Sequence, residues 1–240
     1  MGGMLLARVA LLLAGTAMLV LIGSGPFYQL DLLSLDAAYT GLGLAAAIGI
    51  AALVAGIATI VSAVRVRSIP HVAFGLTAVL LGIAAVAIPI RARADAAAAA
   101  PLHDVSTDLE HPPAFKILAS DYDESPATLQ RDAATDALQR RAYPDIKPLM
   151  LPVGTADAFE DVLETMNEFD WPVADASQRE GRVEVTIRSP WFGFQDNLVI
   201  RLTPVGESTR VDIRSVSRDG ANDMGRNAEH IREFLAELRR

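Results

Sequence analysis

Two long stretches without a charged residue constrain this chain more than any other feature. Residues 39–64 and residues 72–90 contain no Asp, Glu, Lys or Arg. Crossing about 30 Å of bilayer hydrocarbon takes roughly 20 apolar residues in a helix. We therefore expect a membrane-spanning helix in each stretch.

A third apolar segment, residues 5–23, is shorter and contains Arg8, whose long side chain can reach the headgroups. It is either a retained spanning helix or a signal peptide cleaved near residues 23–25. No clean A-x-A cleavage site follows it, which favours a retained anchor. The sequence therefore predicts a transmembrane unit of three helices in residues 1–95.

The charge distribution separates this unit from the rest of the chain. Residues 1–95 hold five basic and three acidic residues of the chain's 21 and 29, so 16 and 26 remain for the rest, a net charge of −10. An acidic domain argues against nucleic acid, whose phosphates require a basic face. The absence of cysteine excludes disulfides and thiolate chemistry. The scarcity of Lys beside Arg and the abundance of Ala are typical of a bacterium with a GC-rich genome.

Loop charges predict the sidedness of the membrane unit. Arg65 and Arg67 precede the short loop 68–71, which marks that loop as cytoplasmic. The loop 26–36 carries only Asp31 and Asp36 and should lie outside. We therefore expect a multi-pass protein of the bacterial inner membrane with its C-terminal domain in the periplasm.

The C-terminal part reads as an α+β domain, residues 116–240, after an extended linker at residues 96–115. Alternating apolar residues predict strands at 182–189, 197–203 and 209–215, with an edge strand at 146–153. Apolar stripes predict a helix capped by Thr155 and a last helix from about Asp223, capped by Asn222. The expected fold is an antiparallel sheet with helices packed on one face.

Several motifs in this domain occur in a recognisable order. They are Ser106-Thr107-Asp108, Pro112-Pro113-Ala114-Phe115, Ala142-Tyr143-Pro144-Asp145-Ile146, and the run from Asp212 to Arg218 followed by Asp223, Gly225, Asn227 and Ala228. With them, residues 105–238 resemble the domain of unknown function 1499 family, found mostly in bacterial proteins and often behind membrane segments. The resemblance implies no established activity.

Polar residues on the predicted sheet and on the turn after it are the candidate site. One strand face should carry Glu184, Arg188, Arg201, Asp212 and Arg214. These side chains form either a ladder of opposite charges or an anion site, since arginine grips carboxylate and phosphate bidentately. Polar residues near the last helix are either a structural network or a ligand site at a helix N-terminus. The predicted ligand-binding set is Asp196, Arg201, Arg214, Ser217, Arg218 and Asn227.

Other signals predict contacts rather than chemistry. Gly41, Ala45 and Gly49 recur at spacing four and serve either packing within the three helices or docking of another membrane protein. Trp191 and Phe192 belong either to the core or to the membrane interface. No catalytic or cofactor motif occurs, and the spacing of His103 and His111 matches no metal motif.

We therefore expect a membrane-anchored binding or interaction module, an accessory subunit of an envelope assembly. One alternative is a carrier of lipid or another hydrophobic ligand, since a curved sheet closed by a helix can enclose an apolar cavity. The other alternative is an enzyme that acts on a small anionic substrate through the arginines and acids.

Overall fold

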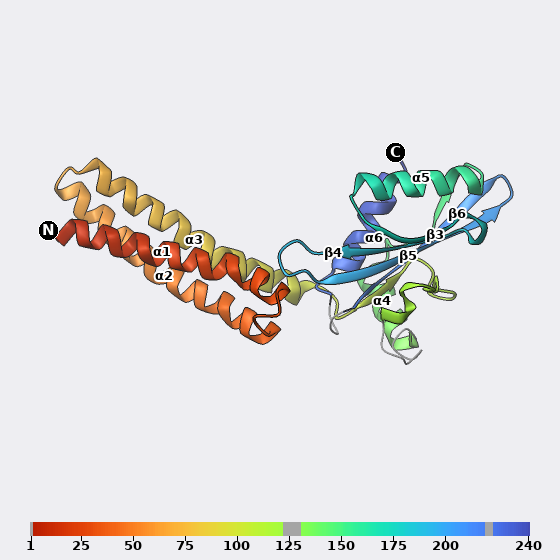
Figure 1. Ribbon diagram of the computed structural model, residues 1–240, viewed down its shortest axis with the longest axis horizontal. Coiled ribbons are helices and arrows are strands. Elements are labelled where there is room, and N and C mark those ends of the chain that lie inside the picture. The colour runs from red at the N-terminus through yellow and green to blue at the C-terminus, as the bar shows by residue number, and fades with distance from the viewer. Residues whose placement is uncertain (1, 122–130, 219–222) are drawn as a thin grey trace. The chain divides into compact units, whose positions relative to one another are not determined.

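The computed structural model describes residues 2–121, 131–218 and 223–240 of the 240-residue chain (Figure 1). The chain divides into two compact units. One comprises residues 1–96 with residues 190–193, and the other comprises residues 97–189 with residues 194–240. Each unit is described separately below.

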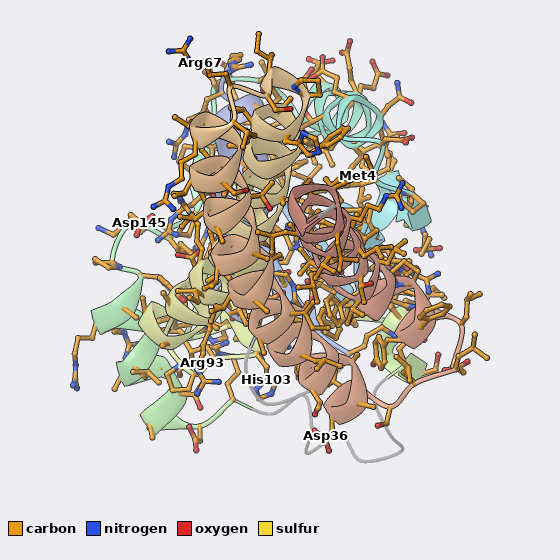
Figure 2. All side chains as sticks on the ribbon, turned by 90° about the vertical axis from the view of Figure 1, so that its left-hand side faces the viewer. Met4, Asp36, Arg67, Arg93, His103 and Asp145 are labelled. Carbon is orange, nitrogen blue, oxygen red and sulfur yellow. The ribbon has the colours of Figure 1, made fainter. Side chains whose placement is uncertain are left out.

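The first unit contains three long apolar helices, as predicted. They are α1 (Gly2–Gln29), α2 (Leu35–Arg65) and α3 (Ile69–Ala98), and each is long and apolar enough to cross a membrane. All three extend beyond the predicted stretches, because a helix can continue past its charge-free part. Asp36 and Arg67, near opposite ends of α2, are both exposed (Figure 2).

Small residues let these helices approach closely. A Cβ added at Gly56 would stand 2.9 Å from the carbonyl oxygen of Gly75, and one added at Gly49 would stand 3.1 Å from that of Gly82. Ala45 and Gly49 are buried, and a Cβ at Gly41 would meet Ser24 of α1 at 2.7 Å. These residues therefore pack inside the chain. Docking of another membrane protein through them stays a prediction.

The segment Pro190–Gly193 belongs to this unit, although it lies between two strands in the sequence. Pro26 has no N–H to donate to the carbonyl of Ile22, and the Trp191 indole donates to that carbonyl at 3.2 Å instead. The Phe192 ring lies 6.1 Å from Tyr28 and 5.7 Å from Tyr39. Phe192 is therefore buried, as the core interpretation expects, but against the helices of this unit rather than in the core of the sheet. Contact of Trp191 and Phe192 with the membrane interface stays a prediction.

The second unit is the predicted α+β domain. Its strands are β1 (Asp104–Ser106), β2 (Leu149–Leu151), β3 (Val173–Ser177), β4 (Arg182–Arg188), β5 (Gln195–Val205) and β6 (Ser208–Ser217). They form an antiparallel sheet of order β1-β6-β5-β4-β3, and β2 pairs with another part of β6. The helices are α4 (Ala133–Ala142), α5 (Thr155–Glu168) and α6 (Arg226–Glu237).

Strand alternation sorts the side chains between the two faces of the sheet. Val185, Ile200 and Ile213 are fully buried on the face that α5 and α6 cover, together with Val162 and Phe234 of those helices. On the opposite face a smaller cluster packs Phe115 and Leu118 over β5 and β6. Both faces are therefore covered, and the second cover is an irregular segment that ends in a short 3-10 helix, Leu118–Asp121.

Three local predictions were wrong. The supposed linker at 96–115 supplies Leu102 and Val105 to the core, because an apolar residue beside a sheet is buried rather than left in solvent. Gly154, not Thr155, is the N-cap of α5. Helix α6 begins at Arg226, and the carboxylate of Asp223 accepts the amide of Asn227 at 2.9 Å. The predicted cap Asn222 lies outside the described residues.

Candidate functional site

The six predicted ligand-binding residues lie in two groups rather than one. Asp196, Ser217 and Asn227 meet beneath α6, on the helix-covered face. Arg201 and Arg214 come from β5 and β6, at positions whose parity places them on the opposite face. The sequence pattern could have shown this division, because Asp196 and Arg201 are five residues apart on one strand.

A buried carboxylate organises the first group. Asp196 is 1% exposed. Its two oxygens accept from the Ser217 hydroxyl, and from Arg226 Nε at 2.9 Å and Nη2 at 3.0 Å. His230 Nε2 lies 3.2 Å from Asp196 Oδ2, the oxygen that also accepts from Arg226 Nε. Asn227 extends the network by donating to Ser217 Oγ at 3.0 Å, so α6 is fastened to β5 and β6 by polar contacts.

The protonation of this group follows from its contacts. Burial alone would raise the pKa of Asp196, but hydrogen bonds from His230 and Arg226 outweigh burial and hold the pKa well below its ordinary value. Burial raises the pKa of Asp223, which the charge of Asp196 also disfavours as an anion. Asp196 is therefore the more acidic of these two carboxyls.

The order of contacts in this group does not suit nucleophilic catalysis. A serine nucleophile needs a histidine between itself and the acid, so that the imidazole can take the hydroxyl proton. Here the acid stands in the middle: Ser217 donates to Asp196, and His230 contacts the other oxygen of the same carboxylate. The arrangement therefore holds Ser217 as a hydrogen-bond donor within the fold.

Arg214 is bound inside the domain. Its guanidinium grips Asp104 bidentately, with Nε 3.1 Å from Oδ1 and Nη2 2.6 Å from Oδ2. Arg131 Nη1 also lies 2.8 Å from Asp104, and all three side chains are nearly inaccessible. This ion pair fastens β1 to β6. The Arg214 guanidinium, which we predicted to bind a ligand, is bound to Asp104 instead.

Arg201 and Arg218 are also in contact with acids of the chain. Arg201 Nη2 lies 3.1 Å from Asp108 and 3.0 Å from Asp212, its cross-strand neighbour. Arg218 Nη2 lies 2.7 Å from Asp121. Of the predicted charge ladder, Arg201 and Asp212 form a cross-strand pair. The contacts of Arg201 and Arg218 also hold the segment that leads from β1 to residue 121 against the sheet.

Glu184 is held in a way that the sequence analysis missed. This fully buried carboxylate accepts the backbone amides of Lys116, Ile117 and Leu118 at 2.7, 3.0 and 2.9 Å, and it pairs with Arg182. The sequence pattern shows only that Glu184 lies on the polar face of a strand, and it does not show which backbone amides that side chain will bind. The segment over this face is therefore fixed by one side chain from the middle of the sheet.

The same segment forms one wall of an open hollow of about 580 Å³. Residues 107–111 line one side, the end of α4 with residues 143–148 lines another, and Arg210 of β6 closes it. Three long basic side chains from these separate elements reach it, Arg140, Lys147 and Arg210. Leu109, Tyr143 and Ile146 supply apolar surface, so the hollow is amphiphilic.

The cations of the hollow differ in their partners. Arg210 contacts Asp108 and Asp212, each at 2.9 Å. Arg140 and Lys147 are exposed, and within the described ranges neither pairs with an acid. Burial would raise the pKa of Asp108, but the amides of His111 and Glu110 and the charges of Arg210 and Arg201 lower it. Asp108 is therefore an anion already neutralised by its neighbours.

The hollow was not predicted, because its residues come from an irregular segment, a helix end and a strand edge. Two motifs noted in the sequence form part of its lining, Ser106-Thr107-Asp108 and Ala142-Tyr143-Pro144-Asp145-Ile146. Burial raises the pKa of Tyr143, and the nearby charge of Asp223 adds to this effect. No group of three His, Asp or Glu side chains suited to a metal ion occurs in the described part of the chain.

Comparison with known proteins identifies the domain but not its activity. The family model for proteins of unknown function, DUF1499, matches residues 104–238. No curated protein matches the chain. The match covers the whole sheet, both groups of polar residues and the hollow. Because it spans more than half of the sequence, the chain belongs to the DUF1499 family.

Proposed function

We propose that this protein is a membrane-tethered binding module, whose C-terminal domain takes an anionic group in the hollow formed by residues 107–111, 140–148 and Arg210. The ligand class is a small molecule that carries a carboxylate or phosphate beside an apolar portion. The protein then acts by holding this ligand at a membrane, as an accessory to an envelope assembly.

The observation that carries the proposal is a pair of cations without acid partners, among the described residues, in an acidic domain. Residues 96–240 carry 26 acids, and Arg201, Arg214 and Arg218 are each bound to one. Arg140 and Lys147 remain exposed in the hollow that Arg210 also lines. An anion placed there would gain charge-assisted hydrogen bonds without displacing an internal ion pair.

The shape of the domain supports binding at an open surface. The space between the sheet and α6 is filled by side chains such as Ile231 and Phe234, both fully buried. A carrier of whole lipids would need an enclosed apolar cavity there. The hollow instead suits the polar end of a ligand, with Leu109 and Ile146 contacting the adjoining apolar part.

Native mass spectrometry of the full-length protein, extracted from its own membrane in a neutral detergent, tests this proposal. The variant Arg140→Glu with Lys147→Glu reverses both cations. Its matched control is Arg141→Glu with Arg239→Glu, two exposed arginines that do not line the hollow. A small-molecule adduct on the wild type and control but not on the first variant supports the proposal. An adduct on all three proteins, or on none, refutes it.

The cellular location belongs to the same proposal. We place the domain in the periplasm of a bacterium, since Arg65 and Arg67 flank the turn between α2 and α3 while Asp31 and Asp36 flank the turn between α1 and α2. Arg91 and Arg93 lie towards the same end as those acids, so a direct test is needed. A C-terminal alkaline phosphatase fusion should be active. An inactive fusion with a fluorescent cytoplasmic reporter would overturn the assignment.

A further inference from the structure

Strand β3 is an open edge of the sheet. It pairs with β4 along one side, and no other strand in residues 2–121, 131–218 and 223–240 pairs with its outer side. An edge strand offers unpaired N–H and C=O groups to another chain. Ala174 and Ala176 are exposed and small, so a further strand could approach without a side-chain clash.

An apolar groove of about 640 Å³ begins where this edge begins. Leu163 and Met166 of α5 line it together with residues 171–173. The Trp171 ring is held by Phe169, stacked at 4.8 Å between centroids. Val173, the first residue of β3, is 42% exposed. A strand added to β3 would therefore bring its side chains beside a rigid apolar surface.

The chain segment that forms the groove is acidic, although one of its acids, Asp175, pairs with Arg182 of β4. Residues 149–178 contain seven acids and no Lys or Arg. The exposed acids of α5 recur at spacings of three and four, where like charges repel each other; they are Asp157, Glu160, Asp161, Glu164 and Glu168. In the described part of the chain none of the five has an ion-pair partner.

Asp170 breaks two local rules at the rim of the groove. Its φ of +55° is the left-handed conformation that ends the helix, where Gly or Asn is preferred. The amides of Asp170 and Trp171 donate to the carbonyls of Asn167 and Met166 at 3.1 and 3.0 Å, which completes a Schellman turn. A negative charge also lies at the negative end of the helix dipole, together with Glu168. An aspartate at this position therefore destabilises the isolated domain on both counts. Its negative charge would favour a cation bound at the groove.

We propose that β3 is the docking edge for a cationic partner polypeptide, which adds as a strand to the sheet. An apolar side chain of this strand would occupy the groove at Trp171, and its basic residues would face Glu168 and Asp170. Backbone pairing would supply affinity, and the groove with its acidic rim would supply specificity.

Charge identifies the occupant. A second copy of this chain would offer its own β3 edge, and residues 168–178 contain no Lys or Arg to face Glu168 and Asp170. A basic segment would be attracted instead, because its positive charges would pair with the acids of α5 that have no partner. This site is separate from the hollow, so the two proposals stand or fall independently.

The test uses the full-length protein in nanodiscs of zwitterionic phosphatidylcholine, which has little attraction for a basic peptide. The probe is a capped peptide of about nine alternating Lys and Val residues, whose side chains alternate between the two faces of a strand. Two peptides serve as controls, one with Glu in place of Lys and one N-methylated at alternate residues. Binding is measured by fluorescence anisotropy, and hydrogen exchange reports protection of residues 173–177.

We expect binding of the Lys/Val peptide, protection of residues 173–177, and affinity at least about tenfold lower for both control peptides. Glu168→Gln with Asp170→Asn should weaken binding about tenfold. The matched variant Asp157→Asn with Glu160→Gln, at the other end of α5, should change it less than about threefold. Asn suits the left-handed conformation of residue 170, so the first variant should melt no lower than the wild type.

Each of the other results would overturn the proposal. They are the absence of binding, binding without protection of residues 173–177, equal affinity for the N-methylated peptide, and equal losses in the two double variants. The third result would show attraction by charge alone, without a strand on β3.

Discussion

Replacement of Glu184 by glutamine tests how the segment over the polar sheet face is held. The Glu184 carboxylate accepts four donors, the amides of Lys116, Ile117 and Leu118 and the guanidinium of Arg182. Glutamine has nearly the same shape but replaces one acceptor oxygen by an NH₂ donor. The substitution therefore changes the hydrogen bonds without opening a cavity.

The size of the effect follows from the donors on each oxygen. Ile117 and Leu118 contact Oε2, while Lys116 and Arg182 contact Oε1. The side-chain amide of the glutamine can keep one pair, and its NH₂ group faces the donors of the other. Hydrogen bonds to a charged group contribute about 1.5–3 kcal/mol each. We expect the free energy of local opening at residues 116–118 to fall by about 3 kcal/mol. The loss is not larger because Arg182 keeps Glu180 and Asp175 as partners.

Hydrogen exchange measures this change at the amides concerned. When exchange follows the opening equilibrium, about 3 kcal/mol corresponds to an acceleration on the order of 100-fold. Peptides that contain residues 116–118 should show it, whereas those from α5 should not. Glu180→Gln is the control, because Glu180 also contacts Lys116 and Arg182 but is partly exposed. Acceleration below about fivefold in Glu184→Gln, or equal acceleration in the control, would refute the reasoning.

Two further predictions concern the buried acid and the helix packing. The pKa of Asp196 is depressed in the folded protein, so its carboxylate stabilises the fold above its unfolded pKa of about 4, and this stabilisation is lost as the pH falls further. Asp196→Asn should therefore flatten the fall in stability between about pH 4 and pH 2 in chemical denaturation followed by fluorescence; a wild-type slope would contradict this. Gly49→Leu should lower the melting temperature of the detergent-solubilised protein, since overpacking costs about 1–3 kcal/mol, whereas Gly43→Leu should not, because a Cβ there meets nothing within 4 Å. Equal melting temperatures would show that the close contact with α3 contributes no stability.

The regular part of the fold was predictable because it depends on periodicity. Apolar stretches located all three helices, two of them by the absence of any charge, although α1 continues past the predicted end at residue 23 and through Pro26. Alternation in residues 182–189, 197–203 and 209–215 located the three central strands. Strand β3 was missed because Val-Ala-Asp-Ala-Ser has few of the branched and aromatic residues that strands favour.

The candidate site was less predictable, since it depends on which segments meet. The sequence identified Arg201, Asp212 and Arg214 as a charged face, and two of them are cross-strand neighbours. It could not show that Asp104 and Asp108 come from the supposed linker to pair with the arginines. Contacts between residues 93 to 110 positions apart leave no periodic pattern in a single chain.

The pairing of charges in the domain separates structural residues from candidate binding residues. Buried carboxylates of Asp104, Asp196 and Asp212 each meet an arginine, so these acids mainly hold segments to the sheet. Removal of one partner would leave a buried charge, so we expect the loss of either member of a pair to destabilise the fold. Exposed charges without a partner stabilise the fold little. Among the described residues, Arg140 and Lys147 at the hollow and the acids along α5 have no ion-pair partner, so we infer that each set faces a ligand of opposite sign.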